Sequence, residues 1–288
     1  MSEQLFAQLL VSGLGMGFIF ALIAIGLTLI YGVMDVVNFA HGEFLMVAMY
    51  ASFLAWQAWG VDPIVAVPVV AAAMFAFGVG VYWLLVRRVL GKSMHSQIFA
   101  TFGLMVFLQA LAQFLFGADY RAVQQSVLSG VVEIGGIALP GPQLASMAGA
   151  SVATALLYVL VFRTRTGRLL RAASQDRVAA STLGIDADRM YALAWGIGAA
   201  AVGAAGALLS SFYPVFPRVG GAFVLVAYVV VALGGFGSIH GALVAGVLIG
   251  LLQTLAGFYV SSQLKFVPVY ALYLLVVLVR PRGLFGRI

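Results

Sequence analysis

The sequence lacks the features on which most soluble enzymes depend. It has no cysteine, so it can form neither a disulfide nor a thiolate metal site. Its three histidines lie far apart and form no His-x-x-x-His pair, so no metal site or cofactor is predicted. It contains neither a G-x-x-x-x-G-K-S/T motif nor a hydrophilic run long enough for a nucleotide-binding domain. The chain is therefore not expected to hydrolyse ATP by itself, and no catalytic constellation points to an enzyme.

Charge is also scarce, and this scarcity indicates the class of protein. Of the 288 residues, 64% are hydrophobic and 8% are charged, which is more apolar surface than a soluble domain can bury. We predict an all-α polytopic membrane protein, a bundle of about 8–9 transmembrane helices in one domain over residues 1–288. The net charge of +6 lies in loops on one side, which indicates orientation and contact with lipid rather than nucleic-acid binding. The first residues lack a basic region, so no cleaved signal peptide is expected.

A spanning helix needs about 20 mainly apolar residues, and the chain offers a series of such stretches. The seventh stretch is long enough for two helices, which gives about nine spans with the N-terminus outside and the C-terminus inside. The first span could instead be tilted or re-entrant. Its Gly13, Gly15 and Gly17 are interpreted as a packing stripe of small residues. The predicted stretches are residues 5–31, 36–59, 64–86, 97–116, 143–162, 191–213, 222–260 and 266–279.

The connections between the spans carry their own signals. Arg87, Arg88 and Lys92 form a basic loop, which the positive-inside rule places in the cytoplasm. Residues 117–142 form a longer polar connection with balanced charge, predicted to lie outside. Within it, VVEIGGIALPGP has the pattern of a small hairpin with a Gly-Gly turn.

The most polar segment lies near the middle of the chain, at residues 163–190. It holds nine of the 24 charged residues, and six of these are arginines, so we expect it in the cytoplasm. Apolar residues recur there at roughly helical spacing, which predicts one helix over residues 168–183, ended by Gly184. Such a helix could dock to a partner or could only anchor the topology. The candidate docking residues are Arg171, Ala172, Ala173, Ser174, Asp176, Ala179, Leu183 and Gly184.

Polar residues stand at the start of the second span, where Asn38, His41 and Glu43 follow one another closely. An ionisable group in a membrane helix is costly and often marks a transport pathway. On a helix, Asn38 and His41 would share a face and Glu43 would point elsewhere. A second interpretation is local: Asn38 can cap the helix, and Glu43 lies near the positive end of its dipole.

A second irregular site interrupts the seventh apolar stretch at LGGFGSIHGALVAG. Irregular backbone at membrane depth is tolerated only where it is buried in protein or lines a cavity. We therefore predict two helices meeting at a glycine-rich break, with Gly237, Ser238 and His240 as candidate pathway residues. The His240-Gly241 pair echoes His41-Gly42, a match of two residues that chance explains.

Four ordered blocks carry a resemblance to a known family. GLTLIYGVMDVVNFAHGEFLMVAMYASF resembles the signature of permease subunits of the high-affinity branched-chain amino acid ABC importers. RAASQDRVAASTLGI is similar to that family's cytoplasmic coupling-helix loop, and LGGFGSIHGALVAGVLIG and RPRGLFGR also fit. Together the blocks cover nearly the whole chain. Two positions depart from the family's pattern: His240 stands where proline is common, and Asp35 where a small residue is usual.

The resemblance implies a function and a set of partners. Members of the family work as pairs of related permeases with two ATPase subunits and an external solute-binding protein. The chain would then be a non-catalytic importer subunit in a bacterial inner membrane, in a heterodimer with a sister permease, carrying branched-chain or related hydrophobic amino acids. The alternatives are an ABC permease for urea, short amides or other amino acids, and a proton-coupled secondary transporter that uses His41 and Glu43.

Overall fold

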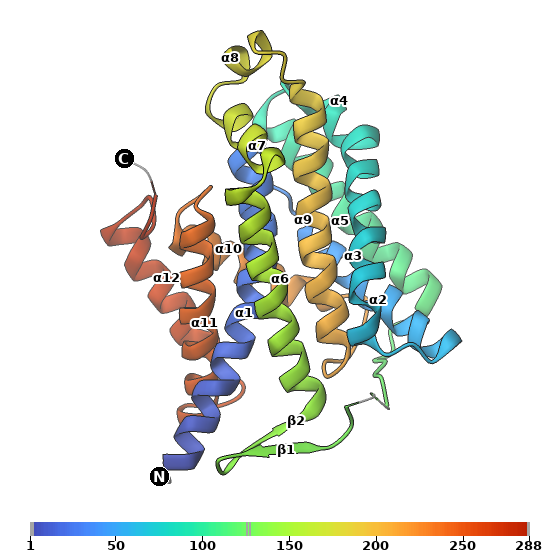
Figure 1. Cartoon of the computed structure of the whole chain (residues 1–288), viewed down its shortest axis with the longest axis vertical. Coiled ribbons are helices and arrows are strands. Elements are labelled where there is room, and N and C mark those ends of the chain that lie inside the picture. Colours follow the sequence, from blue (N-terminus) through green and yellow to red (C-terminus); the bar gives the residue numbers. More distant parts are fainter. Residues whose placement is uncertain (1–2, 125, 127, 287–288) are drawn as a thin grey trace.

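The computed structural model describes residues 3–124, 126 and 128–286. The protein is a bundle of helices with one small β-hairpin (Figure 1). In the described part of the chain, six helices are long and apolar enough to cross a membrane: α1, α3 with its continuation, α5, α6, α9 and α11. The elements are α1 (Glu3–Met34), α2 (His41–Trp59), α3 (Pro63–Val81), the π-helix η1 (Tyr82–Val86), α4 (Arg87–Val89), α5 (Met94–Phe116), β1 (Val131–Ile134), β2 (Ile137–Pro140), α6 (Gly141–Arg163), α7 (Arg165–Gln175), α8 (Arg177–Thr182), α9 (Ala187–Ser210), α10 (Val219–Gly234), α11 (Ile239–Tyr259) and α12 (Val267–Val279).

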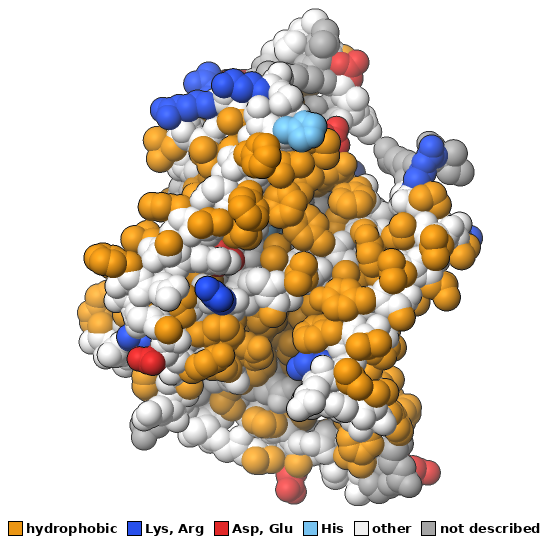
Figure 2. Space-filling model, turned by 180° about the vertical axis from the view of Figure 1, so that it is seen from behind, with side chains coloured by type: hydrophobic (Ala, Val, Ile, Leu, Met, Phe, Trp, Pro, Cys, Tyr) orange, Lys and Arg blue, Asp and Glu red, His pale blue; other side chains and the backbone are white. Residues whose placement is uncertain are grey.

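The helices lie where the apolar stretches predicted them, and the basic connections share one end of the bundle. Helices α4, α7 and α8 and the C-terminus lie at the top of Figure 1, whereas the N-terminus and the hairpin lie at the bottom. Viewed from behind, the middle of the molecule is covered mainly by hydrophobic side chains, with a cluster of Lys and Arg near the top (Figure 2). This distribution is what a bilayer around the middle of the bundle requires.

The hairpin predicted within residues 117–142 is confirmed. Strands β1 and β2 pair antiparallel, with Val131 opposite Pro140 and Ile134 opposite Ile137. The two-residue turn consists of Gly135 and Gly136, whose φ angles are 60° and 84°. A type I′ turn matches the twist of the two strands and requires positive φ at both central residues. Glycine adopts this conformation without steric cost.

Two long helices form the centre of the bundle. Over an 18-residue apolar stretch, α1 and α9 are 83% and 89% buried, whereas α5 is 17% buried. The two helices touch through glycines: a Cβ placed on Gly26 would lie 2.7 Å from the Gly198 carbonyl oxygen, and one on Gly198 would lie 2.8 Å from that of Gly26. The stripe at Gly13 and Gly17 packs against α11, which confirms its interpretation as a packing surface.

Two units of three helices, α1–α3 and α9–α11, form the core of the bundle, and α1 and α9 run through it in opposite directions (Figure 1). Helix α1 packs against α11 and α3 packs against α9, so each long helix is covered by the third helix of the other unit. In each unit the second helix, α2 or α10, starts beside its counterpart. Gly42 and Gly220 face each other there, and a Cβ on either would overlap the other's carbonyl. Transporters are commonly built from inverted repeats.

Helix α2 begins later than predicted. Helix α1 ends where Asp35 takes φ 54° and its N–H donates to the Tyr31 carbonyl at 2.8 Å. Residues 36–40 are not helical, and α2 starts at His41 rather than at Val36. The left-handed conformation strains most side chains, and aspartate adopts it more readily than most residues do.

The central polar segment also differs from prediction. The expected helix over residues 168–183 is two helices, α7 and α8, separated at Asp176, whose φ is −153°. The Asp176 Oδ1 accepts a hydrogen bond from the Ala179 N–H at 3.0 Å and so caps α8. Gly184 does end the segment, with φ 78°, and the Ile185 N–H donates to the Ala180 carbonyl at 3.0 Å, as in a Schellman motif.

The contact between the two units predicts unequal effects at two adjacent glycines of α10. Gly220→Ala would force α2 and α10 apart, because its Cβ meets the backbone of Gly42. We expect a loss of about 1–3 kcal/mol in stability and reduced transport. Gly221→Ala, with nothing within 4 Å of its Cβ, should be neutral or stabilising. Thermal unfolding of the purified variants measures the difference, and equal melting temperatures would show that the contact does not contribute to stability.

Candidate translocation site

Three predicted pathway residues lie deep inside the bundle. Asn38, His41 and Glu43 are each 0% exposed. The His41 Nε2 lies 3.0 Å from the Ile23 carbonyl oxygen of α1. Because a carbonyl can only accept, Nε2 carries the proton and donates the hydrogen bond. Because Ile23 lies in the interior of α1, this bond fixes the start of α2 against the middle of the central helix.

Asn38 acts on its own turn. Its Oδ1 accepts a hydrogen bond from the Ala40 N–H at 3.1 Å, and its carbonyl accepts from the His41 N–H at 3.2 Å. The N-cap position of α2 belongs to Ala40, which makes no side-chain capping bond. The Asn38 side chain therefore stabilises the turn that leads into α2. It does not cap the helix, which is what the local interpretation had proposed.

Glu43 reaches a different helix. The Gln109 Nε2 of α5 donates to the Glu43 Oε1 at 2.8 Å. The Glu43 Oε2, the Asn38 Nδ2 and the His41 Nδ1 are buried and have no hydrogen-bond partner among the described residues. A buried polar atom without a partner costs free energy, so such atoms are candidates for a bound water or solute group. Glu43 and His41 thus bond to different helices, α5 and α1.

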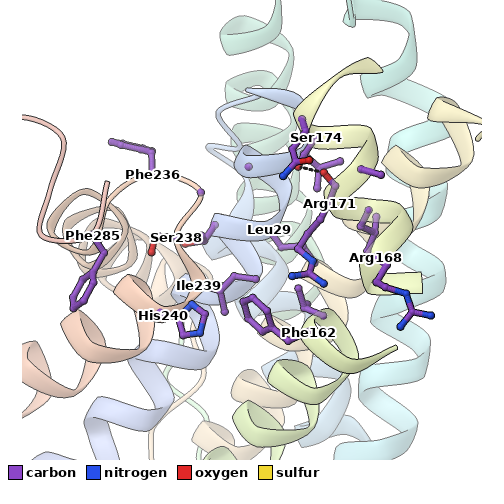
Figure 3. A pocket seen from close by; sticks show the side chains of 18 residues that line it. Leu29, Phe162, Arg168, Arg171, Ser174, Phe236, Ser238, Ile239, His240 and Phe285 are labelled. Atoms are coloured by element: carbon purple, nitrogen blue, oxygen red, sulfur yellow. Dashed lines mark hydrogen bonds between the residues drawn. The ribbon is translucent and has the colours of Figure 1, made fainter. Parts of the chain in front are cut away.

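The glycine-rich break is confirmed, and it opens onto a cavity. Helix α10 ends at Gly234 and α11 begins at Ile239; between them Gly235 and Gly237 have φ angles of 96° and 79°. The Ser238 Oγ accepts a hydrogen bond from the Gly241 N–H at 3.1 Å and caps α11. The adjacent cavity of about 800 Å³ is formed by α1, α6, α7, the break and the C-terminal tail. Its lining includes Thr28, Leu29, Phe162, Arg168, Arg171, Ser174, Phe236, Gly237, Ser238, Ile239, His240 and Phe285 (Figure 3).

The C-terminal tail holds the break in place. The N–H groups of Leu284 and Phe285 donate to the carbonyls of Leu233 and Gly234 at 2.8 and 3.2 Å. They thereby satisfy carbonyls at the end of α10 that have no partner within the helix. Phe285 of the tail is therefore part of the wall of this cavity, which we call the inner cavity.

His240, at the wall of the inner cavity, contacts α6 directly. Its Nε2 shares a hydrogen bond of 2.9 Å with the Tyr158 hydroxyl, and its ring lies 4.6 Å from that of Phe162. The Arg171 guanidinium lies over the ring of Phe162, 5.2 Å from the ring centre. These contacts join the break to α6 and α7 at the basic end of the bundle.

The two groups of predicted residues are near each other but not in one cavity. Gly237, Ser238 and His240 line the inner cavity; Asn38, His41 and Glu43 do not. Thr28, at the cavity wall, is five residues from Ile23 on α1, a rise of roughly 8 Å along the helix. A second cavity of about 540 Å³ lies at the other end of the bundle and is lined by Phe53, Trp56, Gln57, Asp119, Tyr120, Arg121, Ala122 and Gln124.

Sequence reasoning missed several residues of these sites. Gln109 is an isolated amide in an apolar span, and that signal could have singled it out. Tyr158, Phe162 and Phe285 carry no such signal, because aromatic residues are common in membrane helices. The role of Phe285 depends on the tail folding back, which no local pattern predicts.

The docking candidates of the central segment lie in three environments: packed against the bundle, at the cavity wall and exposed on the surface. Ala173 is 3% exposed, and with Leu170 it packs α7 against the bundle. Helix α7 contacts α1, α6 and α9. Arg171 and Ser174 line the inner cavity, whereas Asp176, Ala179 and Gly184 are exposed and Leu183 is 80% exposed. Helix α7 therefore helps to pack the bundle, and its buried Ala173 is not open to a docking partner.

Together the fold and the cavities define a multi-pass membrane protein with buried polar groups at mid-depth and a cavity at its basic end. A family model described as the branched-chain amino acid transport system permease component matches residues 9–279. The chain belongs to this family.

Individual relatives match over nearly their full length. The permease protein LivH of the high-affinity branched-chain amino acid transport system of Escherichia coli K12 is 34% identical, covering 100% of this chain and 98% of the relative. The corresponding BraD of Pseudomonas aeruginosa is 30% identical over 98% and 96%. A probable LivH of Methanocaldococcus jannaschii is 26% identical over 92% and 88%. No solved structure matches the chain.

Loss of the hydrogen bond between Gln109 and Glu43 should lower the stability of the protein. Gln109→Leu leaves the buried Glu43 Oε1 without its donor, which should lower stability by about 1–3 kcal/mol. Gln113→Leu, one turn further along α5 and exposed, is the matched control and should change little. Urea or thermal unfolding of the two purified variants compares them. If both unfold alike, the carboxylate does not depend on this bond.

Proposed function

We propose that the chain is the permease subunit of an ATP-binding-cassette importer for branched-chain or related hydrophobic amino acids. The observation that carries this proposal is the match to named branched-chain amino acid permeases over the full length of the chain. In this proposal residues 1–288 form one non-catalytic transmembrane domain. An external solute-binding protein delivers the solute, and partner subunits hydrolyse ATP.

The proposed topology has eight or nine spans in a bacterial inner membrane. The shorter helices α2, α10 and α12 complete the six long ones, and α2 and α10 begin beside the middle of the bundle. The end that carries α4, α7, α8 and the C-terminus faces the cytoplasm under the positive-inside rule. The hairpin and the N-terminus then face the solute-binding protein.

The proposed pathway includes the two polar sites. The inner cavity with Gly237, Ser238 and His240 is its cytoplasmic part, and Asn38, His41 and Glu43 mark its closed middle. Unpartnered buried atoms at mid-depth support this assignment, because a conformation that opens the bundle would give them partners. The permease then alternates between outward and inward openings by movement of one unit against the other.

The proposed coupling element is α7 together with α8. The exposed α8 would sit in a groove of the ATPase, and α7 would transmit its movement to α1, α6 and α9, which it contacts. A sister permease would provide the second half of the transporter, as a heterodimer. Lipid surrounds the remaining apolar surface.

Purification of the assembled importer tests the proposal directly. The chain is co-expressed with candidate ATPase, sister-permease and binding-protein subunits, and ATP hydrolysis is measured with a panel of amino acids, urea and short amides. Stimulation by leucine, isoleucine or valine supports the proposal. Stimulation by urea or amides alone would move the chain to the alternative importer class, and a chain that transports without any ATPase would overturn it.

A proton-coupled secondary transporter is the second candidate function, and buried Glu43 is the observation that favours it. Glu43→Gln keeps an acceptor oxygen for Gln109 but removes the titratable proton. In an ATP-driven permease, uptake should persist with an unchanged pH profile. In a proton-coupled transporter, uptake should be lost or become insensitive to pH. Uptake of radiolabelled leucine between pH 5 and 8 decides between them.

The exposed face of α8 predicts where bulk blocks docking. Ala179→Trp adds a large side chain to an exposed position, so the bundle should fold normally while binding to the ATPase subunits is lost. Ala58→Trp, exposed at the opposite end of the bundle, is the control and should co-purify with them. If Ala179→Trp also co-purifies and supports ATP-driven uptake, α8 is only a topological anchor.

A further inference from the structure

One arginine of the proposed coupling element points away from the ATPase side. In Figure 3 the Arg171 side chain extends from α7 toward Phe162, with Ile239 and His240 on the far side of the inner cavity. Arg168, one turn earlier, directs its guanidinium away from those residues. Among the described residues, Arg171 has no acidic partner within ion-pair distance. Its charge is therefore available to an anion in the cavity.

The opposite wall offers further groups that suit an anion. Ile239 and His240 form the first turn of α11, where backbone N–H groups have no acceptor within the helix. The Ser238 hydroxyl and the His240 ring lie beside them. Thr28, 1% exposed at the cavity wall, has a hydroxyl without a hydrogen-bond partner among the described residues. This buried hydroxyl is an independent sign that the cavity receives a polar group.

The rest of the cavity wall is apolar. Leu29, Phe162, Phe236 and Phe285 supply side chains that could surround a small hydrocarbon group. The cavity volume of about 800 Å³ lies within the ordinary range for small-molecule sites, roughly 300–1,000 Å³. A ligand with one anionic group and one branched apolar side chain fits both kinds of wall.

We infer that the inner cavity is a release site for the transported amino acid, in which Arg171 binds the α-carboxylate and the aromatic wall holds the side chain. This inference rests on the proposed function and adds to it a specificity-determining residue. Because Arg171 lies on α7, movement of the coupling element displaces the group that binds the carboxylate. Solute release and the ATPase cycle are thereby linked through one side chain. An anionic lipid headgroup is the competing occupant.

Inhibition by solute from the inner side tests the site. The complete importer is reconstituted in liposomes with ATP inside, and initial uptake of radiolabelled leucine is measured while the lumen holds increasing unlabelled leucine. The wild type should be inhibited by lumenal leucine but not by leucine amide, which lacks the free carboxylate. Arg171→Gln should raise the half-inhibitory lumenal concentration by about tenfold or more, because it removes a charge-assisted bond.

Arg165→Gln is the matched control, since it removes the same charge from an exposed position of the same helix that does not line the cavity, and it should behave as the wild type. Three results would overturn the inference: no inhibition of the wild type, equal inhibition by leucine amide, or equal shifts in the two variants. An Arg171→Gln effect that follows the anionic-lipid content of the liposomes, and not lumenal leucine, would also overturn it in favour of a lipid headgroup. Failure of the wild type to import any branched-chain amino acid would instead contradict the proposed function.

A second measurement covers the case in which Arg171→Gln abolishes uptake altogether. The chain has no cysteine, so Phe236→Cys places its single thiol at the wall of the inner cavity. Leucine should slow the reaction of this thiol with a maleimide in the assembled, nucleotide-free complex, whereas leucine amide should not. Adding Arg171→Gln should remove the protection and adding Arg165→Gln should preserve it. Protection that survives the loss of Arg171 would exclude its role in binding the carboxylate.

Discussion

Close backbone contact between glycines is the constraint on which the rest of this structure depends. Gly26 meets Gly198 where the central helices α1 and α9 touch, and Gly42 meets Gly220 where α2 and α10 begin. Lipid offers no hydrophobic driving force for helix association, so close packing and hydrogen bonds must supply it. The contacts are reciprocal. They bring the beginnings of α2 and α10 together inside the protein.

This arrangement explains why polar groups can lie so deep. Residues 36–40 are irregular at a depth where exposed backbone would be costly, but they lie beside α1 and are covered by neighbouring helices. His41 donates to the Ile23 carbonyl, the Thr101 Oγ1 donates to the Val37 carbonyl at 3.0 Å, and Gln109 supports Glu43. The first bond joins the start of α2 to α1, and the other two join Val37 and Glu43 to α5. The polar site is thus held by α1 and α5 rather than by α2 alone.

Much of the fold followed from local signals, and the exceptions share a physical cause. Apolar length located the helices, the Gly-Gly pair located the hairpin, and glycines marked the break before α11. The turn at Asp176 and the late start of α2 at His41 could not be read from periodicity, because both depend on tertiary contacts that outweigh helix propensity. The burial of Ala173 was hidden for the same reason, since small residues suit either a packed face or a docking face. At the candidate sites, His240 and Ser238 were identified by the break, whereas Tyr158 and Phe285 join the cavity only through the packing of α6 and the return of the tail.

In this account, α7 joins the exposed α8 to the central helices, and the glycine break stands across the inner cavity from it. In the proposed mechanism, movement of α7 relative to the break converts ATP hydrolysis in the partner subunits into opening of the cavity. Spin labels on Ser174→Cys and Phe236→Cys, both at the cavity wall, report their separation by pulsed electron resonance in a complete importer freed of other cysteines. The account predicts that the distance distribution shifts between the nucleotide-free and ATP-trapped states. The same distribution in both states would contradict it.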